Sequence, residues 1–176
     1  MLAWIVIYPT KQKNNVSIDI EAVKKAITIP EFTHTDLLEI ALTHPSKIYE
    51  NDNLKRQHQE RQEREYRRLA ILGDVMFNAA VVDYLHQCCS NFNQGSITQW
   101  KNHIVSRKQA YDAKILKLRQ LCQLGGSEKY KHETMQQDLL GEMFEALLGA
   151  IYLEFERDFY EFSQWLGKHF LANAFN

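Results

Sequence analysis

Apolar residues recur every three or four positions along most of this chain, which is the period of an amphipathic helix. All three prolines lie within the first 45 residues, so the longer part of the chain carries no residue that would break a helix. The pattern predicts an all-α protein. Its expected helices span residues 18–27, 35–44, 66–89, 97–121, 127–155 and 158–170, the fourth either continuous or broken in the middle.

Local signals set the ends of these helices. Thr35 has the hydroxyl of an N-cap, Pro45 is expected to end the helix that begins there, and Gly125 with Gly126 is expected to form a turn. The charged stretch "ENDNLKRQHQERQEREYRR" at residues 50–68 has almost no apolar side chain. It predicts either a solvated helix or loop, or an arm that contacts RNA.

Composition narrows the class of protein. The 176 residues are 45% hydrophobic, which is enough for one domain with a sizeable core. The net charge of -1 gives no bulk attraction to nucleic acid or to a membrane, so any such partner must be held by a local patch. The apolar start "MLAWIVIY" is too short to span a bilayer and is expected to be a docked strand or an arm that packs on a partner. The three cysteines lack the spacing of a zinc site. We therefore expect a cytoplasmic protein with no membrane partner.

One acid stands inside the most apolar predicted helix. In "LAILGDVMFNAAVV", residues 69–82, apolar side chains surround the helix, and Asp74 and Asn78 are the exceptions. They are four residues apart and share a face. A buried carboxylate is costly unless it is neutralised, hydrogen-bonded or bound to a cation. Asp74 is therefore either a structural residue satisfied by an arginine or a helix end, or a metal ligand.

A second stretch, "QQDLLGEMFEALLGAIYLEF", carries three acids on one narrow stripe. Asp138, Glu142 and Glu145 fall at i, i+4 and i+7. The small neighbours Gly141 and Gly149 let another helix or a ligand come close, and like charges at this spacing repel unless a cation lies between them. The stripe is either the acidic edge of a core helix or a set of oxygen ligands for a divalent metal, and we favour the metal.

The two acidic helices together suit one kind of chemistry. If they pack side by side, Asp74 can converge with Glu142 and Glu145 in an oxygen-only site of the kind that Mg²⁺ prefers, with Mn²⁺ as a substitute. Such a site suits the hydrolysis of a phosphodiester. The sequence shows no evident Ser-His-Asp arrangement and no glycine-rich phosphate loop.

Three segments in this order resemble the ribonuclease III catalytic domain: "ALTHPS" (41–46), "RLAILGDVMFN" (68–78) and "FEALLGAIYLE" (144–154). The motifs of that family read like "ERLEFLGDAVLN" and "ADAFEALIGAIYLD". The resemblance covers about residues 30–172, preceded by an N-terminal arm or short helix over residues 1–29. It implies an all-helical endonuclease bundle that dimerises and cuts each strand of double-stranded RNA with a Mg²⁺ site from one subunit.

The resemblance also implies roles for individual residues. Asp74 matches an aspartate that is catalytic and binds metal, and Glu145 matches the second essential ligand. Glu142 stands where the family has an aspartate, so the carboxylate is kept but is one methylene longer. Ile71 stands where the family often has a phenylalanine that inserts into the partner subunit of the homodimer.

Two family glutamates are missing, because Arg67 and Ala70 occupy their positions. The position of Ala70 carries a metal ligand in the family, so one of four carboxylates is gone. Asp138 and Asn78 are candidate auxiliary ligands. The short Mini-III branch of the family also has a small residue at that position, in "AYIGD", and its "VSAKAQA" resembles "HIVSRKQA" at 103–110. Loss of this carboxylate is therefore compatible with activity.

A cluster of basic side chains is expected to supply RNA affinity. The double-stranded RNA-binding domain that follows the catalytic domain in bacterial ribonuclease III has no counterpart before Asn176. The cluster either contacts the phosphates of an A-form duplex or is an ordinary solvated face, and its members are Lys101, Arg107, Lys108, Lys114 and Lys117.

Two functions remain open. The first is a Mg²⁺-dependent endoribonuclease that acts on double-stranded or structured RNA, such as ribosomal RNA precursors. The second is a catalytically impaired relative that keeps the fold as an RNA-binding or ribosome-associated protein, which Ala70 favours. Retention of Asp74, Glu142 and Glu145 favours the enzyme, because a protein that only binds phosphates gains nothing from carboxylates near them.

Overall fold

The computed structural model describes residues 18–106, 117–129 and 133–173. These residues form α-helices, one 3₁₀ helix and no β-strand, apart from an isolated bridge between Thr43 and Gln123. The all-α prediction is confirmed. The helices are α1 (Ile20–Ile27), α2 (Thr35–Ala41), α3 (Pro45–Tyr49), α4 (Arg56–Cys88), α5 (Gln94–Ile104), α7 (Leu118–Leu121), α8 (Gly126–Lys129), α9 (Glu133–Glu154), α10 (Phe159–His169) and η1 (Leu171–Asn173).

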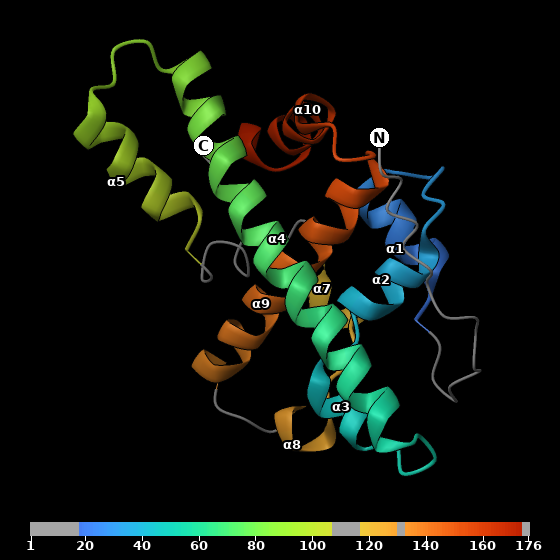
Figure 1. The fold of residues 1–176 in the computed structure, drawn as a ribbon. Coiled ribbons are helices and arrows are strands. Elements are labelled where there is room, and N and C mark those ends of the chain that lie inside the picture. The colour runs from blue at the N-terminus through green and yellow to red at the C-terminus, as the bar shows by residue number, and fades with distance from the viewer. Residues whose placement is uncertain (1–17, 107–116, 130–132, 174–176) are drawn as a thin grey trace.

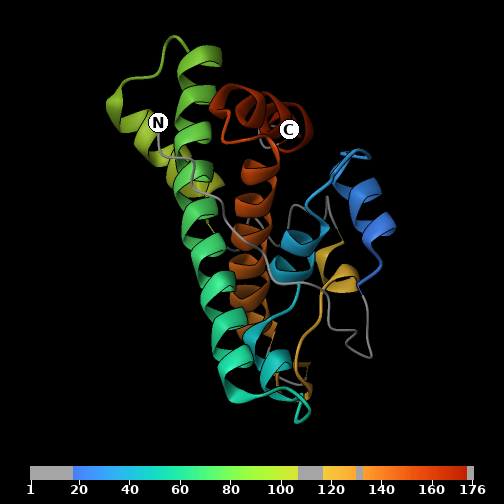
Figure 2. The same ribbon diagram turned by 45° about the vertical axis from the view of Figure 1, so that its right-hand side comes forward.

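Two long helices, α4 and α9, form the centre of the molecule. They cross in Figure 1 and stand side by side in Figure 2, with α10 across one end of the pair and α1 and α2 on one flank. Between them lies a cluster of buried rings in which Phe144 stacks on Phe170 at 5.2 Å and Phe77 meets both edge-on at 5.7 and 5.5 Å. This aromatic core fixes the two helices on which the predicted acids lie.

Two glycines make the crossing of α4 and α9 a backbone contact. A Cβ on Gly73 would lie 1.8 Å from the carbonyl oxygen of Glu145, and a Cβ on Gly149 would lie 2.2 Å from the carbonyl oxygen of Leu69. No side chain fits at either position, so the helices approach more closely than ordinary helix packing allows. The prediction that small residues let another helix come close is confirmed at Gly149.

Helix α4 begins ten residues before the predicted start at residue 66. Its first turns have no apolar stripe, but they carry ion pairs one turn apart, from Arg56 Nε to Glu60 Oε1 at 3.0 Å and from Arg67 Nη2 to Glu63 Oε1 at 3.4 Å. The amide of Gln59, which is buried, donates to two carbonyl groups before the helix, those of Ile48 (3.3 Å) and Asn51 (3.1 Å). From Arg56 onward the charged stretch is therefore a solvated helix, while contact with RNA stays a prediction.

The predictions for Thr35 and Pro45 are wrong in detail. Helix α2 ends at Ala41, and Pro45 begins α3 instead of ending the helix before it, because a proline at the first helical position has no N–H to leave unpaired. The N-cap of α2 is His34, one residue before Thr35. The carboxylate of Glu154, at the end of α9, accepts the backbone N–H groups of Thr33 (2.7 Å) and His34 (3.0 Å), so a distant side chain holds the segment that leads into this helix.

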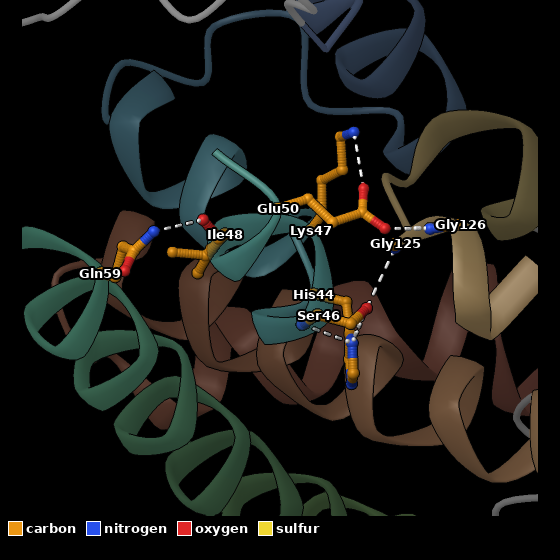
Figure 3. A network of polar contacts seen from close by, with 8 residues as sticks. All are labelled: His44, Ser46, Lys47, Ile48, Glu50, Gln59, Gly125 and Gly126. Carbon is orange, nitrogen blue, oxygen red and sulfur yellow. Dashed lines mark hydrogen bonds and ion pairs between the residues drawn. The ribbon is translucent and has the colours of Figure 1, made fainter. Parts of the chain in front are cut away.

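Gly125 and Gly126, predicted to form a turn, instead lead into a helix, and their backbone ties α3 to the chain before α9 (Figure 3). Ser46 Oγ accepts the N–H of Gly125 at 3.0 Å, and the Glu50 carboxylate accepts the N–H of Gly126 and pairs with Lys47 Nζ at 3.0 Å. Gly126 also begins α8, so the helix predicted over 127–155 is two helices, α8 and α9.

The predicted boundaries of the first and last helices agree with the structure. Asp19 and Asp158 cap α1 and α10, each accepting a backbone N–H three residues on at 3.0 Å, so both helices are confirmed within two residues. The helix predicted over 97–121 is interrupted: α5 starts earlier, at Gln94, and ends at Ile104.

Length and composition alone would let one described helix, α4, cross a membrane. The core helix of a globular protein passes the same test. Because α4 packs against α9, crossing it in Figure 1 and standing beside it in Figure 2, we interpret it as a core helix.

Candidate functional site

The candidate site lies where the polar stripe of α4 meets the acidic stripe of α9. On α4 the stripe runs through Arg67, Ala70, Asp74 and Asn78, spaced three or four residues apart. Asp74 directly follows Gly73, whose Cα lies against the backbone of Glu145. The crossing thus holds the two predicted catalytic positions on adjoining turns of different helices.

Asp74 is exposed, which corrects the expectation that protein surrounds this carboxylate. Gly73 takes the position that faces α9, and Asp74, about 100° further around the helix, lies exposed beside the contact. The Asn78 amide donates to Asp74 Oδ1 at 2.9 Å and to the Asp74 backbone carbonyl at 2.8 Å. Asn78 therefore orients the Asp74 carboxylate, and the prediction that the two share a face is confirmed.

Glu142 and Glu145 are both half-buried on α9, one turn apart, whereas Asp138 is exposed. The Glu142 carboxylate is ion-paired and hydrogen-bonded to Nη1 of Arg67 across the crossing. The sequence shows that Arg67 replaces a family glutamate, but it does not identify Glu142 as its partner. The available signal was its spacing, since residue 67 lies seven positions before Asp74, on the same helical face.

Tyr66, like Arg67, has a relation to the site that the sequence did not predict. Its ring is fully buried, and its hydroxyl has no hydrogen-bond partner among the described residues. Burial raises the pKa of Tyr66 above its usual value, and the negative charge of Glu142 raises it further, while Arg67 acts in the opposite direction. The charges of the Arg67–Glu142 pair therefore act on this buried phenol.

The donor chemistry of Asp74, Glu142 and Glu145 fits a hard divalent cation such as Mg²⁺. Within the described residues, however, no three His, Cys, Asp or Glu side chains form a ready-made metal-binding group. Arg67 engages Glu142, and Ala70 offers no carboxylate. The three acids therefore stay a prediction as metal ligands, and so do the auxiliary candidates Asp138 and Asn78.

The structure brings one of the predicted RNA-binding residues to this site. Lys101 of α5 is half-buried, and its Nζ donates to Asn78 Oδ1 at 3.4 Å, beside an open groove between α4, α5 and Phe159. Lys117 is exposed at the N-cap of α7. Arg107, Lys108 and Lys114 lie outside the described residues.

Apolar side chains on α4 lie open beside Asp74. Ile71, Val75 and Val82 are 69%, 52% and 41% exposed. The exposure of Ile71 leaves its side chain accessible to a partner, and its place at a dimer interface stays a prediction.

Comparisons with known proteins agree with this architecture. A family model described as ribonuclease-III-like matches residues 34–172. Ribonuclease 3 of Magnetococcus marinus is 32% identical over 128 residues, which cover 70% of this chain and 49% of that protein. Ribonuclease 3 of Lactiplantibacillus plantarum is 30% identical over 128 residues, which cover 72% and 52%. The chain therefore spans about half the length of these relatives.

A solved structure of a ribonuclease III nuclease domain has a similar fold. The nuclease domain of ribonuclease III from Campylobacter jejuni, in a structure whose description refers to a region involved in dimer formation, has a TM-score of 0.64 and 25% identity. The likeness covers 86% of this chain and 99% of that one. Together with the family match over residues 34–172, this shows that the chain belongs to the ribonuclease-III-like family.

Proposed function

We propose that this chain is the nuclease domain of an endoribonuclease that hydrolyses double-stranded or structured RNA, ribosomal RNA precursors included. The observation that carries the proposal is the glycine crossing of α4 and α9, at which Asp74 directly follows the residue in contact with Glu145. Family membership supports the same reaction.

The cofactor in this proposal is Mg²⁺, with Mn²⁺ as a substitute, held by Asp74, Glu142 and Glu145. When bound, such an ion supplies charge that activates water and stabilises the attacked phosphate. Asn78 holds the Asp74 carboxylate in one orientation, which lowers the cost of ordering it during the reaction. Lys101, which contacts Asn78, offers a positive charge for a phosphate beside the acids.

RNA and a second copy of the chain are the proposed partners, and the cytoplasm is the proposed compartment. Duplex RNA is recognised by its shape, phosphates and 2′-hydroxyl groups, so a few basic side chains such as Lys101 and Lys117 can contribute without reading bases. The exposed Ile71, Val75 and Val82 support a homodimer formed through α4.

One observation favours a second function, that of a catalytically impaired relative that binds RNA or the ribosome. Ala70 supplies no carboxylate to a metal site, and the Glu142 carboxylate is already ion-paired with Arg67.

A cleavage assay separates the two functions. The full chain is incubated with a labelled RNA duplex in Mg²⁺ or in chelator, with the single strand as the control substrate. Cleavage of the duplex in Mg²⁺ alone is the expected result. Binding of the duplex without cleavage at any Mg²⁺ or Mn²⁺ concentration would contradict the enzyme and leave the impaired relative.

A further inference from the structure

The guanidinium of Arg67 lies on one of the carboxylates proposed as metal ligands. Its Nη1 pairs with Oε1 of Glu142, while its Nη2 lies 3.4 Å from Oε1 of Glu63 on the preceding turn of α4. The side chains of Arg67 and Glu142 are 50% and 18% exposed. The pair therefore lies at the solvent edge of the α4–α9 crossing, where an ion from solution can reach it.

Local sequence explains how Arg67 reaches across to α9. Ala70 lies between Arg67 and Asp74 on the same stripe of α4 and has no side chain beyond Cβ to block the path. Both positions 67 and 70 are acidic in the motif that the chain resembles, so this face of α4 has lost two carboxylates and gained a guanidinium.

The charges around Glu142 show why a cation is needed there. Glu142 and Glu145 are one turn apart on α9, so their negative charges repel. The Glu142 side chain is only 18% exposed, so water compensates little of its charge. Arg67 offsets this charge within the chain itself.

We propose that Arg67 is a tethered cation that competes with a divalent metal ion for Glu142, an inference that rests on the proposed function. The guanidinium and a metal ion are both attracted to the negative charge of Glu142 and repel each other, so each weakens the binding of the other. The apparent metal affinity is then the intrinsic affinity multiplied by the fraction of molecules in which Arg67 has released Glu142. Glu63 gives the displaced guanidinium a second partner one turn away, because its other oxygen, Oε2, accepts the Tyr49 hydroxyl at 2.6 Å and leaves Oε1 for Arg67.

Calorimetric titration with MnCl₂ tests this competition on the full chain without reference to activity. Arg67→Gln should tighten Mn²⁺ binding by roughly tenfold or more, since the apparent affinity rises toward its intrinsic value once no guanidinium holds Glu142. Arg68→Gln is the matched control: it removes the same charge one residue on, but Arg68 pairs with Glu65 at 3.0 Å. The control should bind Mn²⁺ within roughly twofold of the wild type, because an exposed pair contributes little.

Thermal melting gives a second readout. Without metal, Arg67→Gln should melt below Arg68→Gln because Glu142 loses its counterion, and saturating Mn²⁺ should close that gap, since a ligand that binds the folded state stabilises it. Arg67→Lys keeps the charge but not the planar fork and should bind Mn²⁺ with an affinity between those of the wild type and Arg67→Gln.

The possible outcomes separate the two proposals. If the wild type binds Mn²⁺, Glu145→Gln does not, and Arg67→Gln binds no more tightly than Arg68→Gln, the competition is overturned while the metal site stands. A melting gap that persists in saturating Mn²⁺ would also overturn it. If no variant binds Mn²⁺, both the competition and the proposed metal dependence fail.

Discussion

Replacing Gly73 by alanine tests whether the α4–α9 crossing is the element on which the site is built. The added Cβ would lie 1.8 Å from the carbonyl oxygen of Glu145 and 2.6 Å from the backbone nitrogen of Gly149. Both are main-chain atoms, so no rotamer change can relieve the overlap. The two helices must move apart, and the acids of the site move with them.

The size of the effect follows from two opposing contributions. Overpacking a well-packed site costs typically about 1–3 kcal/mol, and a clash with main-chain atoms belongs at the upper end of that range. Alanine has a helix propensity about 1 kcal/mol better than that of glycine, which offsets part of the cost. We expect a net loss of about 2 kcal/mol or more in the free energy of unfolding. For a chain of this size that corresponds to a decrease in Tm of about 4–8 °C.

Gly167→Ala in α10 is the matched control for this experiment. Gly167 is also buried within a helix, but a Cβ there would meet only the Tyr84 ring, at 3.4 and 3.5 Å, which is ordinary contact. It should be neutral or stabilise the protein by up to about 1 kcal/mol through helix propensity. Urea denaturation of both variants measures the difference. A Gly73→Ala protein as stable as Gly167→Ala would refute the backbone crossing.

Two further predictions concern the segment that leads into α2 and the exposed face of α4. Burial acts to raise the pKa of Glu154, but hydrogen bonds from Thr33 and His34 outweigh burial and hold the pKa below its usual value. The contribution of Glu154 to folding stability is therefore present above the unfolded-state pKa and is lost as the pH falls through the folded-state pKa. Glu154→Gln should therefore lower the free energy of unfolding by about 1–2 kcal/mol at neutral pH. In urea denaturation at several pH values it should also reduce the loss of stability toward acid pH, and an unchanged dependence on pH would show that Glu154 has no such role. Ile71→Asp should convert a dimer into a monomer in sedimentation experiments with unchanged helicity, because it places a charge in the exposed apolar face; a dimer that persists would remove Ile71 from the interface.

Several helices follow from the sequence because their signals are local. The apolar pattern predicts α1, α10 and the body of α9, and the structure adds the caps of the first two, Asp19 and Asp158. The start of α4 does not follow from apolar periodicity, because ion pairs along the helix and the buried Gln59 stabilise its first turns instead. Pro45 illustrates an ambiguity, since the same residue can follow one helix or begin the next.

The site was predictable as a set of residues but not as an arrangement. The spacing of Glu142 and Glu145 shows that they share a stripe, and Asp74 and Asn78 show the same on α4. Which face of α4 is turned to α9 depends on a contact between distant segments, at Gly73, and that contact leaves Asp74 exposed. The partner of Arg67 lies 75 positions away, so no local pattern identifies it.

The most direct test of the central claim compares duplex RNA cleavage by Asp74→Asn and Asp83→Asn. Asp83 is a matched control on the same helix, since Gln87, four residues on, donates to it at 2.8 Å just as Asn78 donates to Asp74 at 2.9 Å. With Asp74 as a catalytic residue, Asp74→Asn should lose roughly a hundredfold or more in the initial cleavage rate, as loss of one essential electrostatic group does in other enzymes. Asp83→Asn should keep nearly the full rate. Equal rates for the two variants, or an Asp74→Asn protein as active as the wild type, would contradict the account.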